Sequence, residues 1–210
     1  MIGTEQAATA KGRETRERIV RAAAELVAER GVAGASLDRV RARAEASKSQ
    51  LYHYFTDRDD LMRAVARAAN DAVLGGQAEL FAQLGTMAGL RAWADALVEL
   101  QRARAGRGGC PIGSLASQLG ERDEGARLEL AAGLERWESA IRQGLDQMAA
   151  RGELRPGVDT AVLAQRTLTA VQGGLLLTQV RRDPEQLRSA LDGALDMVAD
   201  ARIQNSTREE

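Results

Sequence analysis

The side chains best suited to recognising a partner through hydrogen bonds lie together in residues 47–55. This stretch holds the only histidine and both tyrosines of the chain. Lys48 is able to donate to the O6 and N7 atoms of guanine, and Gln50 to pair with adenine through two hydrogen bonds, each good pair giving ~1–3 kcal/mol of discrimination. Either side chain could instead contact only phosphate oxygens. The chemistry that these residues favour is recognition of a DNA duplex.

The aromatic side chains of this stretch suit phosphates better than bases. Tyr52 and Tyr54 are expected to bind the DNA backbone through their hydroxyl groups. His53 fits a phosphate contact and an ordinary surface position equally well, and one histidine gives no indication of a pH switch. Arg58 begins the next predicted helix, where main-chain N–H groups favour phosphate. The residues predicted to contact DNA are Ser36, Lys48, Ser49, Gln50, Tyr52, His53, Tyr54 and Arg58.

Two short helices are predicted to hold these side chains. Ser47 is a favoured N-cap, and Leu51 and Phe55 lie four residues apart, so one face of the helix that follows Ser47 packs inward. Residues 36–44 predict a preceding helix that begins at Ser36, and residues 45–46 form the tight turn between the two helices. The pair is a helix-turn-helix, a motif whose second helix enters the major groove of DNA.

Residues 14–65 resemble the DNA-binding domain of the TetR family of bacterial regulators. The resemblance rests on an apolar helix over about 14–30, on Gly31 after it, on the sequence LYHYF in the recognition helix, and on the acidic and basic start of a fourth helix. Glu45 departs from the family pattern, which usually has glycine at this turn. The resemblance implies an all-α homodimer with a three-helix helix-turn-helix domain, followed by a helical domain that binds an effector and dimerises through its last two long helices.

The distribution of charge agrees with DNA contact through the N-terminal part. Residues 11–67 contain 13 basic and 9 acidic side chains, whereas residues 68–210 contain 16 basic and 20 acidic ones. Solvated charge on helix faces would explain this asymmetry nearly as well. Lys11, Arg13 and Arg16 form an arm that either reaches a phosphate or minor groove, or is simply a solvated start.

Catalytic and metal-binding chemistry has little support. Cys110 has no histidine outside the recognition stretch to activate it, and no spacing of histidine, cysteine and carboxylates matches a metal motif. The glycine-rich residues 106–113 lack the strand and lysine of a phosphate-binding loop. We therefore expect no enzyme activity, metal or cofactor. One cysteine, no signal peptide and no membrane-spanning stretch lead us to expect a soluble cytoplasmic protein.

The remainder of the chain is predicted to be a second domain, residues 69–204, after a DNA-binding domain of residues 11–68. Gly173 and Gly174 interrupt a predicted helix over 160–181, where each costs about 1 kcal/mol, so they indicate close helix approach or space for a bound molecule. Core packing explains both tryptophans as well as a pocket does. The residues predicted to line an effector pocket are Trp93, Cys110, Trp137, Ile141, Thr169 and Gln172.

These features together predict a sequence-specific transcriptional regulator. We expect a homodimeric repressor that leaves a palindromic operator when a small apolar or aromatic effector binds. One alternative is a repressor that senses oxidants or electrophiles through Cys110, although an inert thiol fits the sequence too, because reactivity requires exposure and a lowered pKa. Another alternative is a helical interaction protein that no longer binds DNA.

Overall fold

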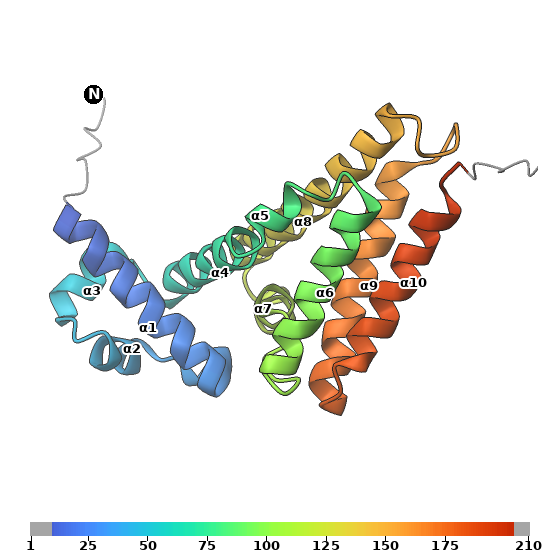
Figure 1. Ribbon diagram of the computed structural model, residues 1–210. Helices are drawn as coiled ribbons and strands as arrows, with labels where there is room; N and C mark the ends of the chain where they lie inside the picture. The colour runs from blue at the N-terminus through green and yellow to red at the C-terminus, as the bar shows by residue number, and fades with distance from the viewer. Residues whose placement is uncertain (1–9, 204–210) are drawn as a thin grey trace, which may run out of the picture. The chain divides into compact units, whose positions relative to one another are not determined.

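The computed structural model describes residues 10–203, and its regular structure there is helical apart from one antiparallel bridge between Leu154 and Arg202 (Figure 1). This confirms the predicted all-α fold. No helix in the described range has the length and apolar character needed to cross a bilayer. The helices are α1 (Ala10–Gly34), α2 (Leu37–Arg43), α3 (Lys48–Tyr54), α4 (Arg58–Gly75), α5 (Ala78–Phe81), α6 (Met87–Ala103), α7 (Pro111–Leu119), α8 (Glu124–Ala150), α9 (Thr160–Arg181) and α10 (Glu185–Asp200).

The described chain divides into two compact units, and the first is not continuous in sequence. It consists of residues 10–71 together with residues 115–130, and the second unit takes up the rest. The predicted domain limits, 11–68 and 69–204, do not include this return of the chain, and residue 204 lies outside the described range. Side-chain contacts between residues about 60 positions apart hold the segment in the first unit, and no local pattern reveals such contacts.

The first unit is built on α1, whose apolar stripe is buried as predicted. Ile19, Ala23 and Leu26 are at most 3% exposed. The helix was expected to stop at Gly31, and its backbone does leave the helical conformation there, with φ 70° and ψ 172°. One further helical turn follows the kink and ends at Gly34. Glycine suits the kink because an L side chain is disfavoured at positive φ.

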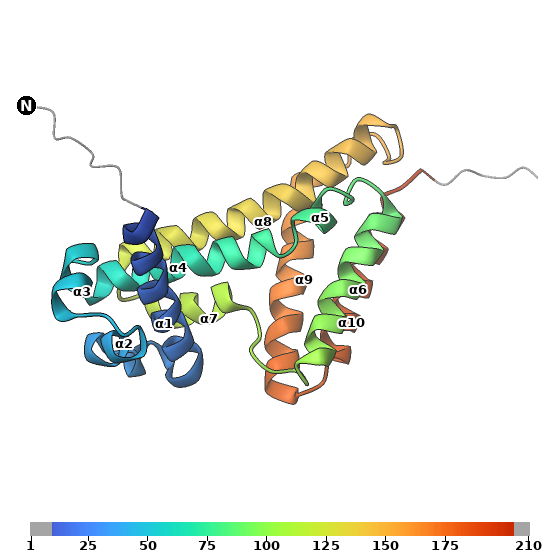
Figure 2. The same cartoon turned by 60° about the vertical axis from the view of Figure 1, so that its left-hand side comes forward.

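The second unit contains α6, α9 and α10, which lie side by side in both views (Figures 1 and 2). The two adjacent glycines of α9, Gly173 and Gly174, have different surroundings. A Cβ atom on Gly174 would lie 2.8 Å from Cδ1 of Leu187, so α10 approaches the α9 backbone closely there, whereas a Cβ atom on Gly173 would meet nothing within 4 Å. Close helix approach, one of the two predicted roles, therefore holds for Gly174.

Local capping signals fix several helix starts. Asp159 accepts hydrogen bonds from the N–H groups of Ala161 and Val162 at 3.0 and 3.1 Å, so α9 begins where the sequence predicted. At α10, Pro184 is the N-cap, and Glu185 is the first helical residue. The short helix α5 was not predicted, because four residues are too few to show a helical pattern.

Candidate nucleic-acid interface

The turn between α2 and α3 closes with two backbone hydrogen bonds. Glu45 N–H donates to the carbonyl of Ala42 at 3.3 Å, and Ala46 N–H donates to that of Arg41 at 3.0 Å. This pair of bonds defines a Schellman motif, which requires a left-handed residue in the Glu45 position. Glu45 has φ 48°, so it adopts the conformation that glycine usually supplies at this turn. The helix-turn-helix geometry is thus kept without glycine, at the cost of local backbone strain.

A capping box fixes the start of α3. Ser47 Oγ accepts from the N–H of Gln50 at 3.1 Å, while Gln50 Oε1 accepts from the N–H of Ser47 at 2.9 Å. Leu51 and Phe55 are each 2% exposed and hold the inner face, as predicted. The guanidinium of Arg16 in α1 lies 5.3 Å from the centre of the Phe55 ring, within the range of a cation–π contact.

The outer face of α3 presents the predicted polar side chains to solvent. Lys48, Ser49 and His53 are exposed, and Tyr52 is 50% exposed. Tyr54 is half-buried, and its ring packs edge-on against His53 with 4.8 Å between the ring centres. These five residues therefore share one short helix, although Tyr54 offers less of its surface than its neighbours.

The other three predicted contact residues, Gln50, Ser36 and Arg58, already make hydrogen bonds within the first unit. Gln50 Oε1 is engaged in the capping box, so a contact that leaves the box intact uses mainly the Nε2 donors. Ser36 Oγ accepts from the N–H of Arg39 at 3.4 Å and caps α2. The Arg58 guanidinium donates to the carbonyl of Val32. Bidentate pairing of Gln50 with adenine would need a second acceptor bond at the same oxygen.

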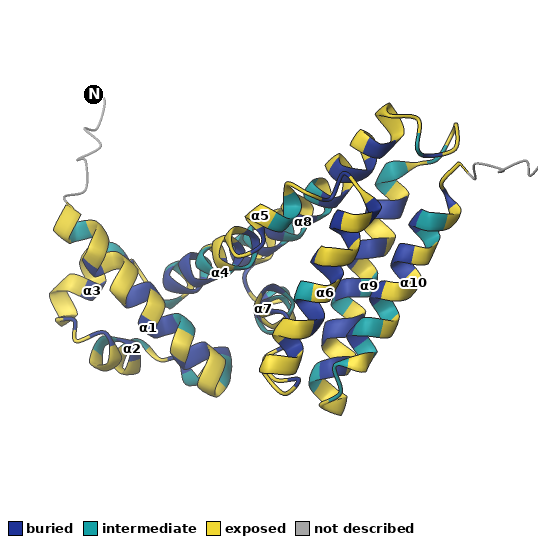
Figure 3. Cartoon of the chain, viewed as in Figure 1, coloured by how far each residue is buried: buried dark blue, intermediate teal, exposed yellow. Residues whose placement is uncertain are grey.

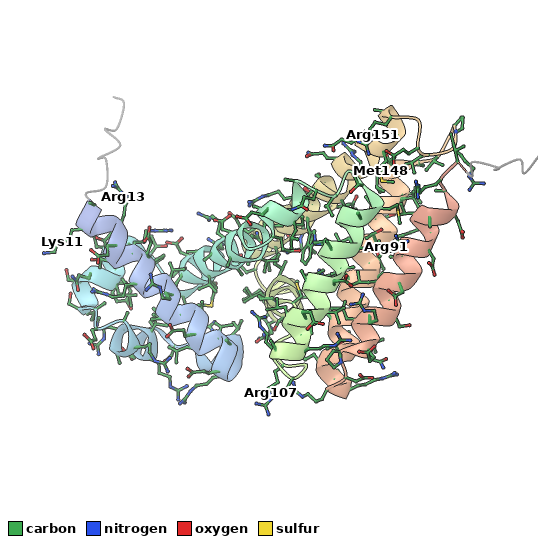
Figure 4. All side chains as sticks on the ribbon, in the orientation of Figure 1. Lys11, Arg13, Arg91, Arg107, Met148 and Arg151 are labelled. Atoms are coloured by element: carbon green, nitrogen blue, oxygen red, sulfur yellow. The ribbon has the colours of Figure 1, made fainter. Side chains whose placement is uncertain are left out.

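An ion pair ties α2 to α1 in the first unit. Both terminal nitrogens of Arg43 donate to the carboxylate of Glu29 at 3.0 Å, and one also reaches Glu25 at 3.3 Å. The hydrogen bonds from Arg43 lower the pKa of Glu29, and those to Glu29 and Glu25 raise the pKa of Arg43. Figure 4 places Lys11 and Arg13 at the start of α1, where the sequence predicted a basic arm.

The predicted effector residues belong to the second unit, and most of them are in its interior. Trp93 and Ile141 are fully buried, and the indole N–H of Trp93 donates to Gln77 Oε1 at 2.9 Å. Trp137 is 1% exposed, and its indole N–H has no partner. Gln172 likewise has a buried Nε2 without a partner. Two hydrogen-bond donors are thus held inside this unit unsatisfied, which folded proteins rarely tolerate.

Cys110 and Thr169 differ from the rest of this predicted set. Cys110 is 8% exposed, and such burial does not favour the thiol-sensing alternative. Thr169 is exposed on α9, and its hydroxyl donates to the carbonyl of Gln165 at 2.8 Å, so it does not lie with the interior residues as predicted.

Some polar features of the structure had no signal in the sequence. A hollow of about 380 Å³ lies where α9 begins and α10 ends, lined in part by Arg155, Val162 and Arg166, and it contains none of the predicted effector residues. Gln118 and Asp123 make long-range hydrogen bonds within the first unit. Among residues 10–203, no cluster of three or more histidine, cysteine or acidic side chains could hold a metal ion.

Two segments of the chain match known protein families. Residues 19–65 match the family described as bacterial regulatory proteins, tetR family. Residues 86–194 match the tetracyclin repressor-like, C-terminal domain. These two matches coincide with the helix-turn-helix and with most of the helices that follow it.

Individual relatives agree with this result. The chain is 28% identical over 173 residues to the transcriptional regulator AcuR of Cereibacter sphaeroides, covering 81% of this chain and 79% of that one. It is 22% identical to the HTH-type transcriptional repressor DhaR of Mycobacterium sp. (strain GP1), over 82% and 86%. A TetR transcriptional regulator from Chloroflexus aurantiacus superposes with a TM-score of 0.74 at 27% identity, over 91% of this chain and 98% of that one. The helix-turn-helix in the first unit, the helical second unit and these matches all agree. The chain is a transcriptional regulator of the TetR family.

Proposed function

We propose that this regulator is a homodimeric repressor whose α3 helices read a near-palindromic operator. The observation that carries the proposal is the exposed polar face of α3, with Lys48, Ser49 and Tyr52 on a helix whose start is fixed by a capping box. A rigid start matters because side chains at the N-terminus of a recognition helix contact the base edges. The relative DhaR is a transcriptional repressor, and this similarity supports repression here as well.

The dimer is proposed to form through α9 and α10. Large apolar side chains on α9 remain exposed at helical spacing, with Leu176 59% and Val180 72% exposed, and Leu177 and Val162 extend the same region. Figure 3 shows how exposed and buried residues alternate along this helix. Exposed apolar stripes of this kind are typical of surfaces that a partner covers. A twofold dimer would place the two α3 helices in major grooves ~34–36 Å apart.

The effector is proposed to bind inside the second unit, near Trp137 and Gln172. Their unsatisfied N–H donors suit a small, largely apolar or aromatic molecule that carries a hydrogen-bond acceptor. Trp93 is a weaker candidate for direct contact, because its N–H is already bonded to Gln77. An effector that binds more tightly to a dimer whose α3 helices are wrongly spaced for the operator would lower operator affinity. Only the difference in the effector's affinity for the two dimer forms produces release.

Selection of bound sequences from random duplex DNA tests the proposal. The purified full-length protein is mixed with the duplexes at ~150 mM salt, because weaker salt rewards non-specific phosphate contacts. The proposal expects a palindrome whose half-site centres are about one helical turn apart. Recovery of a single, non-repeated site would contradict the dimeric arrangement, and recovery without any consensus would contradict sequence-specific binding by the free protein.

A further inference from the structure

Long side chains from distant parts of the first unit hold both backbone groups of Val32. This residue follows the kink at Gly31, so it lies at the corner between α1 and α2. Its N–H donates to Oε1 of Gln118 in α7 at 2.8 Å, and its carbonyl accepts from the guanidinium of Arg58. Val32 is 5% exposed, so water has little access to replace either bond.

The kink leaves space for the Gln118 side chain. A Cβ atom on Gly31 would lie 3.0 Å from Gln118 Oε1, which is tighter than ordinary contact. The positive φ of Gly31 also disfavours any other residue. The backbone conformation of Gly31 and the lack of a side chain there therefore both allow Gln118 of α7 to reach the backbone of Val32.

Three further contacts fix the segment of residues 115–130 to α4. Arg63 Nε donates to Asp123 Oδ1 at 3.1 Å. Glu129 pairs with Arg67 at 2.9 Å through its carboxylate, and its main-chain carbonyl accepts from Asn70 Nδ2 at 2.6 Å. Gln118 consequently approaches Val32 from a segment that is itself held in place.

The helix that carries Gln118 belongs to both compact units. Residues of α7 up to Ser114 fall in the second unit, and those from Leu115 onward fall in the first. In the first half, a Cβ atom on Gly113 would lie 3.1 Å from Gln172 Oε1 and 3.6 Å from Cβ of Cys110. These two halves form one continuous helix of nine residues.

We propose that Gln118 is a positioning residue for DNA binding. It holds the backbone at Val32, between α1 and α2, in place, and it passes a shift in the first half of α7 on to that backbone. The inference rests on the proposed function, because it explains how the interior of the second unit influences α3. A displacement of α7 moves the acceptor away from the Val32 N–H, and the corner loses one of its two fixed points. Packed helices transmit such shifts as units, because the protein interior is close-packed.

The first test compares Gln118→Met with Gln118→Glu in the full-length protein. Methionine keeps the length of the side chain but removes the acceptor, whereas glutamate keeps an oxygen for the Val32 N–H. We expect Gln118→Met to weaken binding to the selected operator about tenfold, because a head that holds the binding-competent position only about a tenth of the time binds that much more weakly, and Gln118→Glu to stay within about threefold of the parent. Glu121→Gln, an exposed change on the same segment, is the matched control and leaves the affinity unchanged.

Amide hydrogen exchange gives a readout that does not depend on DNA. The Val32 amide should exchange faster in Gln118→Met than in the parent or in Gln118→Glu, while amides of α9 stay protected in all three proteins. Equal exchange at Val32 in all three would overturn the positioning role. If the parent selects no specific DNA, the proposed function fails, and the exchange result still decides whether Gln118 holds the corner.

A double-mutant cycle tests transmission through α7. Gly113→Val introduces bulk beside Gln172 in the first half of the helix, and Gly113→Ala is a milder form in case the larger side chain prevents folding, which circular dichroism detects. We expect the change to weaken operator binding in the parent and to have little further effect in the Gln118→Met background. Additive effects would place the route elsewhere, for example through α4, and would overturn the inference. An absence of any effect in the parent would overturn it as well.

Discussion

Replacement of Asp123 tests the contacts that fold residues 115–130 into the first unit. Asp123 directly precedes α8, and its Oδ1 accepts from the N–H of Ala126 at 3.0 Å and from Arg63 at 3.1 Å. The side chain is 6% exposed. Asp123→Ala removes the N-cap and should lower the free energy of unfolding by about 0.5–2 kcal/mol, or about 2–4 °C of melting temperature for each kcal/mol. The Arg63 guanidinium reaches solvent and adds little to this loss.

Asparagine at the same position separates the cap from the charge. Asn is as good an N-cap as Asp, so Asp123→Asn should keep most of the stability that Asp123→Ala loses. Glu124→Ala, which breaks only an exposed pair with Arg127, should leave the melting temperature unchanged. The account of this contact would be refuted if Asp123→Ala melted like the parent, or if Asp123→Asn were as unstable as Asp123→Ala.

The difference in stability between the parent and Asp123→Asn should depend on pH in a definite direction. Burial raises the pKa of Asp123, but the hydrogen bond from Ala126 and the pairing with Arg63 outweigh it, so the pKa lies below the ordinary value of 3.8. The charged form therefore stabilises the folded state above the unfolded pKa, and this contribution is lost as the pH falls through the lower folded pKa. Denaturation of the parent and Asp123→Asn between pH 7 and pH 3 should show their difference shrinking only below about pH 4.

Three further substitutions test other parts of the structure. Ser47→Ala removes the capping box of α3 and should cost about 1 kcal/mol in thermal unfolding, together with operator affinity; unchanged values for both would show that the box is dispensable. Gly174→Ala forces a Cβ atom against Leu187 and should destabilise the fold by about 1–3 kcal/mol, whereas Gly75→Ala meets open space and should change stability by at most about 1 kcal/mol. Trp137→Phe removes an unpartnered N–H and should leave thermal stability equal or higher; a clear loss would mean that this N–H has a partner.

Features set by neighbouring residues could be predicted from the sequence. Ser36 and Ser47 were recognised as helix caps, since the serine side chain of each reaches the N–H three positions on. The buried pair Leu51 and Phe55 followed from their spacing on one helical face. The polar outer face of α3 followed from the same periodicity, since residues that do not face inward are left to solvent.

Features that depend on distant residues could not be predicted in this way. The contact between Val32 and Gln118 joins positions 86 residues apart, and nothing in either local sequence indicates the other. The internal bonds of Gln50 and Arg58, which restrict what these side chains offer to DNA, likewise required the folded backbone. Thr169 was predicted to line an effector pocket, but it is exposed on α9, and which face of that helix is covered depends on the neighbouring helices.

The affinity of Lys48→Ala for the selected operator tests the central claim most directly. Lys48 is exposed at the start of α3, and Arg104→Ala, which removes an exposed cation near the end of α6, is the matched control for charge. At ~150 mM salt we expect Lys48→Ala to bind the operator about tenfold or more weakly, because a base contact is worth ~1–3 kcal/mol, and Arg104→Ala to bind as the parent does. If both variants lost the same modest amount of affinity, or if neither lost any, α3 would not be the surface that reads the operator.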